Sequence, residues 1–167
     1  NNKQDQSARD HFKKAWDKSN ETHLPSVKKL IKLAFIEKDA PTLKNYVLRT
    51  IPILESQNDH DTILKFLNLA EKAITADVEI LETYGDTLIK TGQIDEGLKK
   101  LRSAGEVSIR QKLYTKTISV YEKIVTIKPD TITFHSRLAK LYSKVSRNED
   151  SLNHYLQAAK ICQERNR

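Results

Sequence analysis

Apolar residues recur at intervals of three and four along almost the whole chain, the spacing that places them on one face of an α-helix. Polar residues, glycine or proline interrupt this pattern at short intervals. The pattern therefore predicts short amphipathic helices joined by turns, each helix packing antiparallel to the next. The predicted helices span residues 5–19, 25–38, 41–56, 60–75, 77–91, 94–110, 113–128, 131–145 and 148–165.

Side chains at the predicted helix boundaries support this division. Asp61, Asp77 and Asp130 stand where an N-cap side chain is expected to accept a hydrogen bond from the first helical turn. Pro52 falls inside the third predicted helix. Because its ring clashes with the preceding turn, Pro52 should kink that helix or split it in two.

Residues of matching size recur at a fixed offset near the C-terminus. At an offset of 34 residues, Leu138 aligns with Ala104, Ala139 with Gly105, Tyr142 with Ser108, Ser151 with Thr117, and Tyr155 with Tyr121. The same spacing begins again at Val78 and includes Leu81, Tyr84, Gly85, Leu88, Gly97, Leu101 and Ala104. A period of this length is typical of helical repeats.

This order of large and small residues resembles the tetratricopeptide repeat. The resemblance is clear over residues 78–165, weaker over 41–77 and poor over 1–40. It implies an all-α fold, a single domain over residues 1–167 in which antiparallel helix pairs stack into a right-handed superhelix. The positions that match lie at His135, Leu138, Ala139, Tyr142, Ser151, Tyr155 and Ala158 in the last repeat, and at Leu101, Ala104, Gly105, Ser108, Thr117, Tyr121 and Ile124 before it.

The two alignments assign the helix at 94–110 differently. Counting forward from Val78 makes it the second helix of a pair, whereas counting back from the last repeat makes it a first helix. The sequence "KPD" at 128–130 fixes the C-terminal register, and it favours the backward count. In either count, Gly85 and Gly97 are expected to let two helix backbones approach closely, and Gly92 to turn the chain between helices.

Composition narrows the class of protein. Glycine and proline are scarce and aromatic residues few, as in all-helical proteins. The single cysteine, Cys162, cannot form an intrachain disulfide and is expected to be buried in the last helix, which favours a reducing, cytoplasmic setting. The N-terminus has neither an initiator methionine nor an apolar signal segment, so the sequence is predicted to be a piece of a longer chain.

Charge is distributed unevenly along the chain. Lysine and arginine outnumber the acidic residues by three over residues 1–60 and by nine over 98–167, whereas residues 61–97 carry a net charge of −5. A basic C-terminal half attracts acidic peptides, nucleic acid or an anionic surface.

The resemblance implies that the first helix of each pair lines a concave binding groove. Under the backward count this groove is basic and suits an extended or helical acidic peptide. Its predicted partner-binding residues are Lys99, Arg102, Arg110, Thr133, Arg137, Lys140 and Lys144.

Catalytic patterns are sparse. The sequence has no glycine-rich phosphate loop, no histidine pair at metal-binding spacing, and no nucleophile elbow. We therefore expect a non-catalytic scaffold without a cofactor that binds a protein or peptide. Two alternatives remain open at this stage: RNA binding by the basic half, and a dimerisation module in which the acidic segment of one copy pairs with the basic half of another.

Aromatic residues are assigned mainly to the core. Tyr84, Tyr121, Tyr142 and Tyr155 are expected to pack between helices. Trp16 is expected to close the N-terminal end of the helical stack, with a partner-facing anchor as the alternative.

Overall fold

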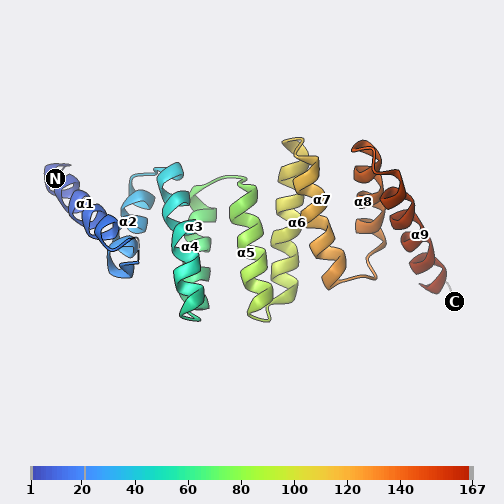
Figure 1. Ribbon diagram of the computed structural model, residues 1–167, viewed down its shortest axis with the longest axis horizontal. Coiled ribbons are helices and arrows are strands. Elements are labelled where there is room, and N and C mark those ends of the chain that lie inside the picture. Colours follow the sequence, from blue (N-terminus) through green and yellow to red (C-terminus); the bar gives the residue numbers. More distant parts are fainter. Residues whose placement is uncertain (1, 21, 166–167) are drawn as a thin grey trace.

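The protein folds as a row of antiparallel α-helices. The structure is a computed structural model that describes residues 2–20 and 22–165. Within these residues there are nine helices and no strand, arranged side by side along the long axis (Figure 1). This confirms the all-α prediction. The helices are α1 (Asn2–Lys18), α2 (Leu24–Ile36), α3 (Ala40–Ser56), α4 (His60–Ala73), α5 (Val78–Lys90), α6 (Ile94–Arg110), α7 (Tyr114–Ile127), α8 (Ile132–Lys144) and α9 (Asn148–Arg165).

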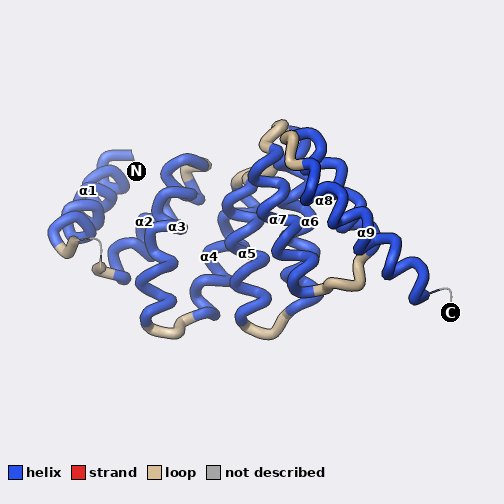
Figure 2. Tube along the Cα trace, turned by 45° about the vertical axis from the view of Figure 1, so that its right-hand side comes forward, coloured by secondary structure: helices blue, strands red, loops and turns tan. Residues whose placement is uncertain are grey.

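Short loops join consecutive helices and alternate between the two long edges of the row (Figure 2). Six of these loops contain a residue with φ between 56° and 83°. Apart from Ala76, in the α4–α5 loop, these residues are 20, 34, 20 and 34 positions apart: Lys38, Asn58, Gly92, Lys112 and Ser146. The 34-residue spacing predicted from the sequence therefore alternates with a 20-residue step. Helices α2, α5 and α8 accordingly begin 54 residues apart, so the structural unit contains three helices.

Helix α6 has two packing faces, which explains why both sequence alignments fit. Near its N-terminus, a Cβ placed on Gly97 would lie 2.8 Å from the carbonyl oxygen of Gly85 on α5. Near its C-terminus, the hydroxyls of Ser108 and Thr117 lie 2.8 Å apart, which joins α6 to α7. The two counts therefore do not conflict: α6 is the second helix of one pair and the first of the next.

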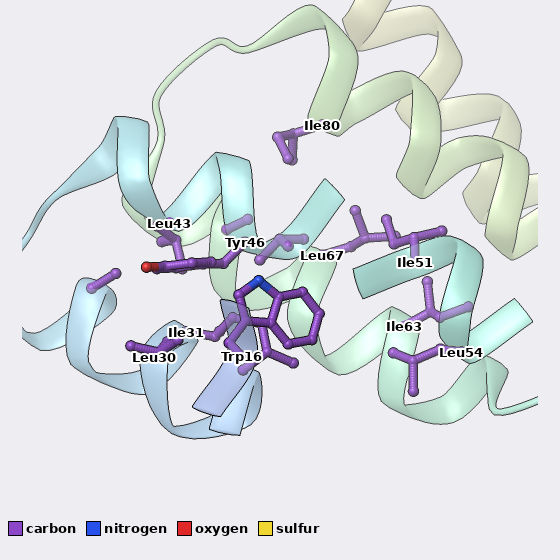
Figure 3. Packing of buried hydrophobic residues seen from close by; sticks show 14 residues of the cluster. Trp16, Leu30, Ile31, Leu43, Tyr46, Ile51, Leu54, Ile63, Leu67 and Ile80 are labelled. Atoms are coloured by element: carbon purple, nitrogen blue, oxygen red, sulfur yellow. The ribbon is translucent and has the colours of Figure 1, made fainter. Parts of the chain in front are cut away.

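Two apolar clusters form the core. The N-terminal cluster surrounds Trp16, which is 1% exposed and whose indole lies beside residues of α2, α3 and α4 in Figure 3. Trp16 is thus a core residue rather than a partner-facing anchor. The C-terminal cluster includes Tyr121 and Tyr142, both fully buried. Tyr155, by contrast, is 44% exposed and Cys162 is also exposed, so the burial expected of these two residues is wrong.

Several boundary predictions are also corrected. Asp77 caps α5 as expected, because its carboxylate accepts hydrogen bonds from the first turn of that helix. Asp59, not Asp61, caps α4, and Thr131 rather than Asp130 stands at the N-cap of α8. Pro52 does not split α3, which runs as one helix with the proline ring exposed. Among the described helices, none has the length and apolar character needed to cross a membrane.

Candidate functional site: a basic groove between α6 and α8

A groove of about 470 Å³ lies across the C-terminal part of the stack. Helices α6 and α8 form its walls and α7 lies between them. We call this feature the basic groove, because it combines four cations and one acid with apolar and aromatic side chains. It is lined by Glu106, Ile109, Arg110, Tyr114, Tyr121, Arg137, Lys140, Leu141 and Lys144.

Close packing beneath the groove fixes the position of Arg137. A Cβ on Gly105 would lie 2.1 Å from a ring carbon of Tyr121, so glycine lets this tyrosine sit against α6. The Tyr121 ring meets Phe134 edge to face, with centroids 5.0 Å apart. The Arg137 guanidinium lies 5.5 Å from the centroid of Phe134 and 6.0 Å from that of Tyr121. The charge is therefore held over aromatic faces at the edge of the groove.

The four cations of the groove have no carboxylate partner within ion-pair distance among the described residues. Lys144 instead lies 5.0 Å from the ring centroid of Tyr114. Elsewhere in the stack, cations between helices are neutralised, as where Lys100 meets Glu71 at 2.6 Å. The groove is thus a concentration of uncompensated positive charge next to apolar surface.

The fold alone does not create this charge. The equivalent positions of the preceding three-helix unit lie 54 residues earlier. There, Ser56 corresponds to Arg110 and Asp86 corresponds to Lys140. The one lysine retained there, Lys90, forms an ion pair at 2.6 Å with Glu55. The equivalent positions therefore carry a hydroxyl, a carboxylate and an ion-paired lysine in one unit, and cations without a carboxylate partner among the described residues in the next.

The structure places four of the seven predicted site residues in this groove, namely Arg110, Arg137, Lys140 and Lys144. Arg102 lies beside it, with its guanidinium 5.5 Å from the Phe134 ring. Lys99 and Thr133 do not line the groove. Lys99 pairs with Glu96 on its own helix at 2.6 Å, and Thr133 is exposed in the first turn of α8. The binding role of the set stays a prediction.

Sequence reasoning missed the apolar part of the groove, which consists of Ile109, Tyr114, Tyr121 and Leu141. Tyr121 packs between helices, as predicted from the sequence, and is fully buried, but its ring also forms part of the base of the groove. Ile109 is 37% exposed in the last turn of α6. An apolar residue next to Arg110 at a helix end was the available signal.

Glu82 and Asp86 of α5 do not contribute to the basic groove, so its mixed sign comes from Glu106 alone. Both carboxylates face α7, where Lys123 contacts Glu82 at 2.9 Å and Asp86 at 2.6 Å, and Lys116 also pairs with Glu82. Burial by itself would raise the pKa of Glu82, but hydrogen bonds from the two lysines outweigh it and hold that pKa below its ordinary value. This cluster joins α5 to α7 and is structural.

Helices packed antiparallel through small residues at 34-residue spacing define a tetratricopeptide-like α-solenoid. No protein-family model matches the chain, and no curated protein matches it. Among solved structures, MamA from Desulfovibrio magneticus RS-1 is 14% identical, with 96% of each chain covered and a TM-score of 0.44. Pseudomonas aeruginosa PilF is 14% identical, with 93% of this chain and 77% of that chain covered and a TM-score of 0.41.

A Podosopora anserina putative kinesin light chain with TPR-like repeats is 10% identical, with 97% of this chain and 96% of that chain covered and a TM-score of 0.37. At these identities and TM-scores, the assignment of function rests on the side chains of the chain itself.

Proposed function

We propose that the chain is a non-catalytic scaffold that binds an acidic segment of a partner protein in the basic groove. The observation that carries this proposal is the set of four cations around an apolar floor, none of which meets a carboxylate in the part of the chain that the structure describes. Cations left unpaired at a concave surface favour an anionic ligand, and the adjacent tyrosine, leucine and isoleucine side chains favour one that also carries apolar groups.

A peptide meets both requirements. Its carboxylates can pair with Arg110 on one wall and with Lys140 or Lys144 on the other, while an apolar side chain between them rests on Tyr114 and Leu141. Bidentate contact is available at the arginine, and the exposed lysines provide attraction at longer range. The partner segment is therefore expected to alternate acidic and apolar residues.

Fluorescence anisotropy tests this directly. The probe is a labelled pool of short peptides in which Glu or Asp alternates with Leu or Phe. Replacing Arg110→Glu together with Lys144→Glu reverses the charge on both walls at exposed positions, and should weaken binding by about tenfold or more. The matched control is Lys29→Glu with Lys32→Glu, which makes the same charge change at two exposed lysines of α2. Equal weakening in both variants would show non-specific attraction and refute the groove.

Nucleic acid is the competing ligand, and a single-stranded RNA probe distinguishes it. RNA affinity should fall steeply between low and moderate salt, because binding releases counterions from the phosphates. The peptide site should persist over that range, since part of its affinity comes from apolar contact. If the RNA binds in the groove and the acidic pool does not, the proposal is wrong.

A further inference from the structure

An apolar stripe on the outer face of α9 has no helix against it among the described residues. It contains Leu152, which is 59% exposed, Tyr155, which is 44% exposed, and the exposed Ala159 and Cys162. These residues are spaced by three and four positions, so they share one face of the helix. Leu156, 57% exposed, extends the stripe at one edge.

The 54-residue period shows which faces of α6 and α3 are equivalent to the stripe on α9. The equivalent residues of α6 are Leu98, Leu101, Gly105 and Ser108. There the face is covered by α7: Leu101 is buried in the same cluster as Tyr121, and Ser108 bonds to Thr117. The equivalent face of α3, through Val47 and Leu54, is buried in a cluster with residues of α4. In both earlier units, therefore, this face is covered by the next antiparallel amphipathic helix, which is α4 on α3 and α7 on α6.

Charge determines which helix fits on α9. In the unit before, α7 approaches α5 through two lysines, Lys116 and Lys123, which pair with Glu82 and Asp86. The residues of α8 that stand at the positions of Glu82 and Asp86 are Ser136 and Lys140. The acidic partners are thus replaced by a hydroxyl and a cation. A helix lying on α9 in the same way meets positive charge where α7 meets negative charge.

We propose that the stripe on α9 docks an acidic amphipathic helix of a partner protein, antiparallel to α9. The helix carries carboxylates where α7 carries Lys116 and Lys123, and large apolar residues where α7 carries Tyr121 and Ile124. This surface lies on the face of α9. It shares Lys140 with the basic groove but none of the groove residues of α6 or α7.

The sequence of α7 supplies the probe. A labelled synthetic peptide with the sequence of residues 114–127, in which glutamate replaces the lysines at positions 116 and 123, presents the required pattern. The matched control peptide keeps both lysines. In anisotropy titrations against the whole chain, the acidic peptide should bind at least about tenfold more tightly than the lysine peptide. In Lys140→Glu, this preference should reverse.

Variants on α9 locate the site. Leu152→Glu with Tyr155→Glu removes the apolar stripe at positions that are already exposed, so the fold should survive while the acidic peptide no longer binds. Asn153→Glu with Gln157→Glu makes the same change in charge at other exposed positions of α9 and should leave binding within about twofold of the original chain. Arg110→Glu alters the basic groove alone and should also leave it unchanged, which separates this proposal from the preceding one.

Three results would overturn the docking site. One is that neither peptide binds, and another is that both bind equally. The third is that sedimentation equilibrium shows a dimer that Leu152→Glu with Tyr155→Glu dissociates, in which case a second copy of the chain covers the stripe.

Discussion

The close approach of α5 and α6 provides a quantitative test of the packing. Gly85 on α5 faces Gly97 on α6, and a Cβ added at Gly85 would lie 2.9 Å from the carbonyl oxygen of Gly97 and 2.9 Å from Cγ of Leu101. Leu101 is fully buried, so it cannot swing away, and the other neighbour is backbone. Gly85→Ala must therefore move the two helices apart.

The expected magnitude follows from two opposing effects. Alanine in a helix interior is favoured over glycine by about 1 kcal/mol, whereas overpacking a tight contact costs about 1–3 kcal/mol. Since one of the clashing atoms belongs to the backbone, the cost should lie at the upper end of that range. We expect Gly85→Ala to lower the free energy of unfolding by about 1–2 kcal/mol, and Gly85→Leu to lower it further.

Urea unfolding followed by far-ultraviolet circular dichroism measures this change. Ser103→Ala is a suitable control, because Ser103 is exposed in the middle of α6 and reports helix propensity without a clash. If Gly85→Ala were instead more stable than the original chain by the propensity difference, the close contact between α5 and α6 would be wrong.

Three further predictions concern ionisable groups. Glu82→Gln should lower the free energy of unfolding by about 1–2 kcal/mol at neutral pH in urea titrations, and the difference should disappear as the pH falls through the depressed pKa of Glu82. Burial, reinforced by His135, whose Nδ1 atom lies 3.0 Å from Nδ1 of His154, lowers the pKa of His154. Unfolding midpoints should consequently fall as the pH drops below about 6.5, and His154→Phe should flatten that dependence. Burial and the hydrogen bond to Glu122 raise the pKa of Tyr142 to about 12, so the stability it contributes should be lost between about pH 10 and 12. Spectrophotometric titration of Tyr142→Phe should lack that last phenol transition.

The helices were predictable because the signal for a helix is local. The range 77–91 predicted for the fifth helix coincides within one residue with Val78–Lys90, since a buried face and a capping aspartate both lie within that short stretch. The three-helix unit was not predictable in the same way. Gly97 and Gly105 both lie on α6, but Gly97 contacts α5 and Gly105 contacts α7. Each glycine therefore fits its own 34-residue helix-pair pattern, and neither pattern alone indicates a third helix.

The groove shows the same limit of local information. Sequence patterns placed cations on exposed helix faces, and Arg137 and Lys140 do line one wall. They could not indicate that the opposite wall is the last turn of α6, which includes Arg110 but excludes Lys99, three helical turns earlier. That depends on where α8 lies relative to α6, a consequence of how α7 packs between them. The two tyrosines of the floor were missed for the same reason, because a residue that packs between helices can also line a groove between them.

The distribution of charge links these observations and bears on self-association. Of the eight carboxylates between residues 61 and 97, six form ion pairs within the chain. A dimer in which this acidic segment binds the basic half of a second copy would have to break pairs such as Lys100 with Glu71, which are already well formed. The cations of the groove, in contrast, form no ion pair with any residue between positions 2–20 or 22–165, so an external acidic ligand gains their attraction without that cost. We therefore expect the chain to sediment as a monomer at low as well as moderate ionic strength. A dimer that dissociates on adding salt would show that the acidic segment prefers an intermolecular partner over the lysines it contacts here.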